Sequence, residues 1–324
     1  MNKDKLRVGV IGVGHLGEYH VQKYLGIPEV ELVGVVDTNL DRANEIAKRY
    51  HTRYYPGGHH DLLEKVDAVS LAVPTEMHFE VAKDILERGV HLLIEKPITY
   101  KIEPADTLIN MAQDRDLVLQ VGLVERFNPA VTKMESLLKQ PVFIESHRMN
   151  LFTTRGIDVD VVLDLMIHDL DIILHVVQSE VKEVHAVGMS VVTGKTDIAN
   201  VRIIFENGVV ANLTASRVSE NTLRKIRVFQ PDAYMSVDCL KREISITRLD
   251  GKSQKIKDLP RVATQKIEYP DSDPLADEIS SFVNVVSKGS VPVVTGKDGR
   301  NALGVALGII EQIERGCKNF KAIN

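Results

Sequence analysis

The sequence has few cysteines, no long apolar run and no excess of basic residues. Cys239 and Cys317 belong to no paired motif, which favours free thiols in a reducing compartment. No apolar run approaches the roughly 20 residues that a membrane helix needs. The 40 Lys and Arg against 45 Asp and Glu give a net charge of −5, which argues against nucleic acid. We therefore expect a cytoplasmic protein that binds neither membranes nor nucleic acids.

The length and composition are those of a soluble globular protein with a large core. A chain of 324 residues predicts about two domains. Hydrophobic residues make up 44% and charged residues 26%, which are ordinary shares for such proteins. Residues 1–5 lead directly into the first expected strand, so we expect no signal peptide.

A glycine-rich loop near the N-terminus is the most informative motif. An apolar run at residues 6–11 is followed by Gly12-Val13-Gly14-His15-Leu16-Gly17 and then by a helical pattern. In such a loop Gly12 allows the tight turn, Gly14 lets a pyrophosphate approach the backbone, and Gly17 lets the helix pack close to the strand. Free N–H groups at the helix start favour the phosphates. The loop predicts a dinucleotide site that includes His15 and Leu16.

An acidic residue follows the second apolar run and indicates which dinucleotide is bound. Asp37 ends that run, about 20 residues beyond the glycine loop, where a carboxylate accepts hydrogen bonds from the adenosine ribose. A carboxylate repels a 2′-phosphate, and no arginine directly follows Asp37. The pattern therefore predicts NAD rather than NADP.

The first part of the chain alternates between strand and helix patterns. Continuous apolar strands separated by helices indicate a doubly wound parallel sheet, whose ligands bind at the carboxyl ends of the strands. Pro74-Thr75 and Glu95-Lys96 follow two such strands, so we expect them to share a crevice with the glycine loop. Strands are expected at 6–11, 32–36, 53–55, 68–73, 90–94 and 118–124, and later helices at 41–50, 78–88 and 104–114.

The second part of the chain is dominated by alternating strands. Asn207-Gly208 is a hairpin signal, and hairpin-joined strands form antiparallel sheets. Strands are expected at 142–149, 184–192, 199–205, 209–216, 225–229, 234–238 and 244–248, and helices at 129–139, 160–177, 274–287 and 299–315. The fold class is therefore α/β: a Rossmann domain at 1–124, then an α+β domain at 125–324 with a large, mostly antiparallel open sheet. An uncovered face of that sheet predicts a homodimer or homotetramer.

Two places in the sequence carry groups suited to acid–base chemistry. Lys96 follows a strand, where it can bond a substrate hydroxyl and transfer its proton; the alternative is a solvated lysine. Asp164, His168 and Asp171 are spaced to share one helix face, on which a carboxylate can orient the imidazole. The alternative for His168 is a core or interface histidine bonded to an acid.

The other histidines carry weaker signals. His59-His60-Asp61 contains metal-binding residue types but lacks further spaced ligands, so a solvated loop is favoured and no metal is expected. His78 follows Pro74-Thr75 closely, where it approaches the cofactor or simply begins a helix.

These motifs together resemble the Gfo/Idh/MocA family of oxidoreductases. The matching segments are VGVIGVGHLG, AVPTEMH, EKPIT, VERFNP, DLMIHDLD and VVTGKDGRNALGVALGIIEQI, which span nearly the whole chain. The resemblance implies Lys96 and His168 as the catalytic pair, with Asp164 in support. It implies Glu95 near the nicotinamide ribose and a cis peptide bond before Pro97. Pro74, Thr75, His78, Lys96 and Arg126 are expected at the cofactor.

The resemblance also indicates a substrate class. Residues 121–129 resemble the subgroup that oxidises the 3-hydroxyl of UDP-linked amino sugars. A diphosphate needs cationic partners. Candidates for that role are Arg126, Arg148, Arg155, Arg217, Arg224 and Arg227. A free-sugar or inositol dehydrogenase, and a non-catalytic NAD-binding regulator, are the alternatives.

Overall fold

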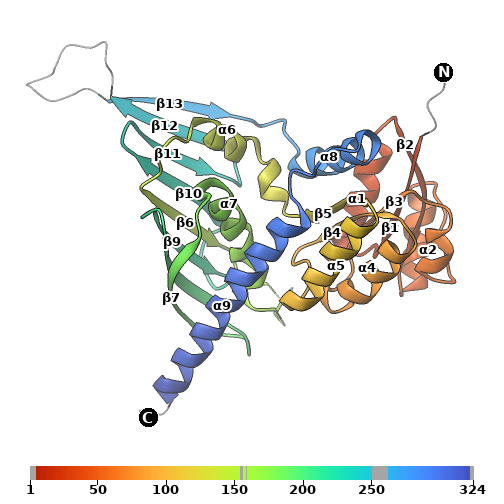
Figure 1. The fold of residues 1–324 in the computed structure, drawn as a ribbon, viewed down its shortest axis with the longest axis horizontal. Helices are drawn as coiled ribbons and strands as arrows, with labels where there is room; N and C mark the ends of the chain where they lie inside the picture. Colours follow the sequence, from red (N-terminus) through yellow and green to blue (C-terminus); the bar gives the residue numbers. More distant parts are fainter. Residues whose placement is uncertain (1–4, 154–155, 158, 250–261, 322–324) are drawn as a thin grey trace, which may run out of the picture. The chain divides into compact units, whose positions relative to one another are not determined.

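The computed structural model describes residues 5–153, 156–157, 159–249 and 262–321, with side chains up to residue 316. The chain forms two compact units (Figure 1). The first contains residues 1–124 and Asp273–Leu303, and the second contains Glu125–Ser272 and Gly304–Asn324. The first unit therefore combines an N-terminal segment that ends at Val124 with a segment near the C-terminus.

The first unit is built on a five-stranded parallel sheet of order β2-β1-β3-β4-β5. The expected Rossmann architecture is therefore confirmed. Its elements are β1 (Leu6–Ile11), α1 (His15–Leu25), β2 (Val30–Val36), α2 (Leu40–Arg49), α3 (His59–Leu63), β3 (Ala68–Leu71), η1 (Thr75–Met77), α4 (His78–Glu87), β4 (His91–Glu95), α5 (Ile102–Asp114), β5 (Leu119–Gly122) and α8 (Pro274–Lys288).

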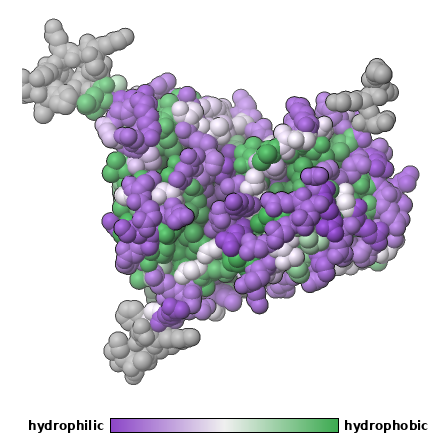
Figure 2. Space-filling view, in the orientation of Figure 1, coloured by the Kyte–Doolittle hydropathy of each residue, from purple (hydrophilic) through white to green (hydrophobic). Residues whose placement is uncertain are grey.

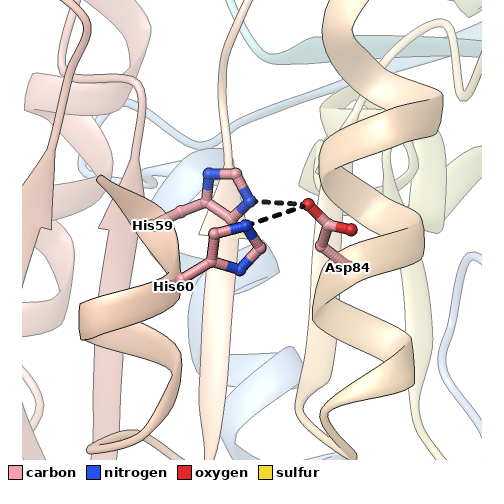
Figure 3. Close-up of side chains that lie close together, drawn as sticks. All are labelled: His59, His60 and Asp84. Carbon is pink, nitrogen blue, oxygen red and sulfur yellow. Dashed lines mark hydrogen bonds and ion pairs between the residues drawn. The ribbon is translucent and has the colours of Figure 1, made fainter. Parts of the chain in front are cut away.

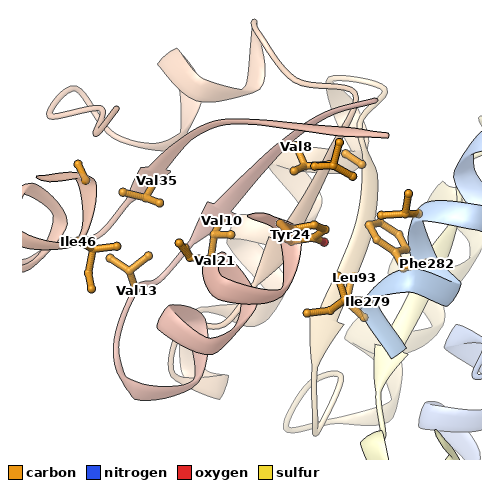
Figure 4. Close-up of a cluster of buried hydrophobic side chains, with 14 residues drawn as sticks. Val8, Val10, Val13, Val21, Tyr24, Val35, Ile46, Leu93, Ile279 and Phe282 are labelled. Carbon is orange, nitrogen blue, oxygen red and sulfur yellow. The ribbon is translucent and has the colours of Figure 1, made fainter. Parts of the chain in front are cut away.

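The core of this unit explains why α8 belongs to it. Val8 and Val10 of β1 meet Tyr24 of α1 and Phe282 of α8 in one buried cluster (Figure 4). All four side chains are fully shielded from solvent. Lys23 of α1 also forms an ion pair with Asp273, directly before α8. Burial of this apolar surface, at about 25 cal/mol per Å², holds α8 against α1.

Two expectations for this unit need correction. The strand expected at 53–55 is a single bridge between Val35 and Tyr54, because the segment meets the edge strand only at Val35. The short helix α3 has no counterpart among the expected elements. It places His59 and His60 in a helix, whereas the sequence favoured a solvated loop.

The second unit contains an eight-stranded sheet of order β13-β12-β11-β10-β6-β9-β8-β7. Only the β6–β9 pair among its described strand pairs is parallel, so the mostly antiparallel expectation is confirmed. The strands are β6 (Phe143–Met149), β7 (Val181–Met189), β8 (Ile198–Phe205), β9 (Val210–Ser216), β10 (Leu223–Gln230), β11 (Ala233–Asp238), β12 (Glu243–Leu249) and β13 (Val262–Glu268), the last of which was not expected.

Helices cover one face of this sheet. Along β6 the buried residues Ile144, Ser146 and Arg148 alternate with less buried neighbours, as a sheet with one covered face requires. Hydrophobic residues still reach the surface (Figure 2). In the second unit, Val187 and Met189 of β7 are both more than half exposed. The remaining elements are η2 (Val124–Phe127), α6 (Pro129–Leu137), η3 (Val162–Met166), α7 (Ile167–Val177) and α9 (Gly296–Lys321). None of the helices described is both long enough and apolar enough to cross a membrane.

Candidate functional site

The glycine loop has the geometry that a bound pyrophosphate requires. Gly12 has a φ of +83°, and a Cβ there would lie 2.6 Å from the carbonyl oxygen of Ala72. A Cβ on Gly17 would lie 1.8 Å from the Gly12 oxygen, so only glycine permits this helix–strand approach. Gly14 instead has no neighbour within 4 Å of its Cβ position. The loop is therefore closed toward the protein and open where a ligand would meet the backbone.

Asp37 lies in a pocket beside this loop. The pocket has a volume of about 300 Å³, and Gly12, Gly14, Asp37 and Pro74 are among its lining residues. Asp37 accepts hydrogen bonds from the backbone N–H of Val13 at 2.8 Å and from that of Asn39 at 2.9 Å. A carboxylate has about four acceptor positions, so two are left for ribose hydroxyls. The structure thus brings together the loop, Asp37 and Pro74, and the free acceptor positions of Asp37 fit the ribose hydroxyls of NAD.

Arg42 is a nearby cation that the sequence analysis did not consider. Its Nε donates to the carbonyl oxygen of Val13 at 3.0 Å, and its guanidinium pairs with Glu18 and Glu45. An arginine committed to two carboxylates is poorly placed to receive a 2′-phosphate. Arg42 therefore agrees with the preference for NAD.

Three other residues expected at the cofactor lie near the carboxyl ends of the strands of the same sheet. His15 and Leu16 begin α1 and are exposed, with the His15 ring 5.0 Å from that of Tyr19. Thr75 lies in η1, half-buried.

His78 lies between the two strand-end turns rather than in the pocket. Its Nδ1 faces the carbonyl oxygen of Pro97 at 2.8 Å and its Nε2 that of Val73 at 3.0 Å. Burial lowers the pKa of His78, although the two carbonyls oppose this effect. A neutral imidazole donates through one nitrogen only, so one of the two contacts is a hydrogen bond at a time. His78 thereby fixes the turn that carries Lys96.

Lys96 stands at the carboxyl end of β4, half-buried, and the bond between Lys96 and Pro97 is cis, as the resemblance implied. The preceding Glu95 turns into the core. Its Oε1 lies 3.0 Å from Nε2 of His20, a fully buried residue of α1. Lys96 and Glu95 therefore differ in surroundings, because neighbouring residues at a strand end point to opposite sides.

A buried carboxylic acid near Glu95 escaped the sequence analysis. Glu278 of α8 is fully buried, and neither of its oxygens has a hydrogen-bond partner among the described residues. Burial, with a smaller effect of Glu95, raises the pKa of Glu278 well above its ordinary range. The available signal was its position on the apolar face of α8, beside Ile279 and Phe282.

The other expected catalytic residues, Asp164 and His168, lie in the second unit, in η3 and α7. The expected regular helix at 160–177 is wrong in its first part, because residues 162–166 form a π-helical turn. In that turn the N–H of Ile167 bonds the carbonyl oxygen of Val162, five residues earlier. A π turn changes the residues per turn, so the shared face of Asp164 and His168 no longer follows from α-helical spacing. Such turns are frequent at functional sites.

Asp164 and the loop before it are held by Arg217. This arginine donates to the carbonyl oxygens of Gly156 at 2.7 Å and Val159 at 2.6 Å. Its guanidinium lies 3.9 Å from the Asp164 carboxylate, whose side chain is 35% exposed. Arg217 therefore holds Gly156 and Val159, which precede the π turn, in place.

Two buried ion pairs, at Asp169 and Asp171, tie α7 to its surroundings directly after His168. Arg148 of β6 bonds Asp169 at 2.6 Å and Glu125 at 2.8 Å. Burial raises the pKa of Glu125, but Arg148, Arg224 and Asn128 together lower it by more, so the net shift of the pKa is downward. Arg126 lies 3.3 Å from Asp171, and both are almost fully buried. These pairs fix α7, and with it the backbone of His168.

The six arginines expected to meet a diphosphate separate into groups. Arg126, Arg148 and Arg217 have side chains exposed by 6% or less, and each pairs with at least one carboxylate of the protein. Arg224 and Arg227 of β10 are 37% and 27% exposed, and they lie 3.7 Å from Glu125 and 3.5 Å from Glu145. Arg155 lies outside the described residues.

The comparisons with known proteins agree with this geometry. The model of the Gfo/Idh/MocA oxidoreductase family, NAD-binding Rossmann fold, matches residues 6–123. The model of the C-terminal domain of the same family matches residues 131–233. The chain belongs to the Gfo/Idh/MocA family of oxidoreductases, and its cofactor is NAD.

Individual relatives extend the match over both units. The chain is 41% identical over 310 residues to the UDP-N-acetylglucosamine 3-dehydrogenase of Acidithiobacillus ferrooxidans, covering 95% of this chain and 97% of the relative. A solved structure of that enzyme matches with a TM-score of 0.90 over 96% of this chain and 98% of the other. The myo-inositol 2-dehydrogenase of Thermotoga maritima is 26% identical, covering 92% and 93%.

Proposed function

We propose that this protein oxidises the 3-hydroxyl of a UDP-linked amino sugar with NAD as the oxidant. The observation that carries the proposal is the 41% identity to a UDP-N-acetylglucosamine 3-dehydrogenase over 95% of the chain. The inositol dehydrogenase matches a similar share of the chain at only 26% identity. The pocket at Asp37 and the placement of Lys96 at a strand end support the same reaction class.

Each part of the chain has a defined task in this proposal. When bound, NAD supplies the hydride acceptor. The glycine loop holds the pyrophosphate, and Asp37 holds the adenosine ribose. Lys96 or His168 takes the proton from the substrate hydroxyl, and Asp164 supports His168. Pairing of Asp169 and Asp171 with buried arginines keeps α7 in place during this transfer.

Arg224 is the arginine that we propose for the diphosphate. Arg224, Ile226 and Val228 occupy every second position of β10, so their side chains lie on the same face of the sheet. Ile226 and Val228 are buried, so this is the covered face, and Arg224 is the register partner of Arg148 of β6. Arg227 lies on the other face, where it pairs with Glu145 at 3.5 Å. We propose that the open face on which Arg227 lies forms the interface of a homodimer or homotetramer. We also propose that the protein acts in the cytoplasm.

The test is NADH formation from NAD⁺ with four substrates: UDP-N-acetylglucosamine, free N-acetylglucosamine, myo-inositol and a free hexose. The proposal expects turnover with the UDP-linked amino sugar and a 3-keto product by mass spectrometry. Turnover with inositol alone would identify a polyol dehydrogenase. Tight NAD binding without turnover on any substrate would identify a regulator, a result at odds with the presence of both Lys96 and His168.

A further inference from the structure

A cluster of two histidines and one aspartate lies on the first unit, and none of the three has a task in the proposed reaction. His59 and His60 are adjacent at the start of α3, and Asp84 comes from α4 (Figure 3). Oδ2 of Asp84 lies 2.9 Å from Nε2 of His59 and 3.6 Å from Nε2 of His60. The two imidazole rings are 4.3 Å apart, centroid to centroid. Adjacent helical residues normally diverge by about 100°, so this convergence on one oxygen is specific.

We propose that His59, His60 and Asp84 bind a divalent transition-metal ion such as Zn²⁺. Ligand atoms from the three residues lie within 4.8 Å of one another. Bonds of about 2.0–2.2 Å in a tetrahedron place ligand atoms about 3.3 Å apart, so small side-chain rotations complete the site. Two imidazole nitrogens with one carboxylate suit Zn²⁺, Co²⁺ or Ni²⁺, whereas Mg²⁺ and Ca²⁺ prefer oxygen ligands.

The exposure of the three side chains fits a reversible site with a water ligand. The side chains of His59, Asp84 and His60 are 22%, 35% and 54% exposed. Three protein ligands leave the fourth tetrahedral position to water. Substitution of His60 should disturb the fold least, because more than half of its side chain is already exposed to solvent.

The site is joined to the cofactor pocket through His59. His59 is one of the residues lining the pocket that contains Asp37 and Thr38. A metal bound to Nε2 of His59 fixes that ring, and therefore one wall of the pocket. Because binding free energies are linked reciprocally, NAD changes the affinity for the metal by the same factor as the metal changes that for NAD. This linkage rests on the NAD pocket, whereas the metal site does not.

The experiment is calorimetric titration of the NAD-free protein with ZnCl₂, supported by the visible spectrum of the Co²⁺ complex. We expect one ion per chain with a tetrahedral Co²⁺ spectrum. His60→Ala and Asp84→Asn should each weaken binding by more than about tenfold, the lower range for loss of a metal-site partner. His185→Ala, which removes another exposed histidine beside a carboxylate, should bind like the parent protein.

Equal zinc binding by the parent protein and both cluster variants would overturn the metal site. A second titration uses protein saturated with NAD⁺. The linkage predicts that NAD⁺ changes the zinc affinity of the parent protein, and that the same NAD⁺ concentration changes it less in Asp37→Ala, which binds NAD more weakly. An unchanged zinc affinity in the parent protein contradicts the linkage but not the metal site. Failure of the dehydrogenase proposal leaves the first titration unaffected, so the two failures are distinguishable.

Discussion

The carboxylate of Asp37 accepts a hydrogen bond from the backbone N–H of Val13 at 2.8 Å, which ties the end of β2 to the middle of the glycine loop. In the proposed function Asp37 therefore has two tasks, to hold the loop and to offer acceptors to the ribose. The loop and Asp37 are thus one structural unit. A change at Asp37 should alter cofactor affinity and cofactor choice together.

We expect Asp37→Ala to weaken NAD binding by about tenfold or more, because a hydrogen bond to a charged group contributes about 1.5–3 kcal/mol. The preference for NAD over NADP should fall as well, because the charge that repels the 2′-phosphate is lost. Fluorescence titration with both reduced cofactors measures this. Asp41→Ala, on α2, is the control. An unchanged preference in Asp37→Ala would remove Asp37 from cofactor selection.

Lys96→Ala should lower kcat by ~10²–10⁴-fold, the usual contribution of a positioned acid or base, while NAD affinity changes little. Steady-state kinetics and a separate NADH titration measure the two effects. The control is Lys101→Ala, which removes a positive charge near Lys96 but at the N-cap of α5 rather than at the end of a strand. If turnover of the Lys96 variant matched that of the control, Lys96 would have no part in proton transfer.

Arg224→Ala should raise KM for the UDP-linked sugar by about tenfold, because it removes a charge-assisted hydrogen bond to the diphosphate. The value of kcat should change less, since the diphosphate is remote from the reacting carbon. Arg227→Ala, on the opposite face of the same strand, is the matched control. Equal effects of the two substitutions would contradict the assignment of Arg224.

Glu278→Gln tests whether the buried carboxylic acid is neutral in the folded protein. Burial raises the folded-state pKa, so the folded state keeps a proton that the unfolded state releases as pH rises. The stability contributed by this group is full below the unfolded pKa and is lost as pH rises toward the folded pKa. The variant lacks this loss, so its advantage grows by about 1.4 kcal/mol per pH unit between the two pKa values.

Urea unfolding of both proteins at pH 4.5, 6 and 7.5 measures that slope. The expected result is a free-energy gap that widens in favour of the Gln variant with increasing pH. A gap independent of pH would mean that Glu278 is ionised in the folded protein, and would require a cationic partner for it.

The sequence predicted those features that depend on local pattern. The parallel sheet, the glycine loop and the position of Asp37 follow from apolar runs and glycine spacing, and the structure agrees. The bridge at Tyr54 was overestimated as a strand because β propensity does not reveal how many partner residues an edge segment meets. The π turn at 162–166 was missed because an apolar periodicity does not distinguish five-residue from four-residue hydrogen bonding.

The long-range groupings were beyond the reach of the sequence for a different reason. Glu278 meets the surroundings of Glu95 only because α8 returns to the first unit, far along the chain. Asp84 joins His59 and His60 only because α4 faces α3. No regular spacing in the sequence indicates either of these contacts. Among the six arginines, three are almost fully buried and two are more exposed, and this difference depends on tertiary contacts that the sequence does not show.

The central claim is tested most directly by the initial rate of NADH formation with UDP-N-acetylglucosamine, compared with that from myo-inositol under the same conditions. The account predicts a much larger kcat/KM for the UDP-linked sugar, with loss of that rate in Lys96→Ala. A larger kcat/KM for myo-inositol, or a rate that Lys96→Ala leaves intact, would contradict it.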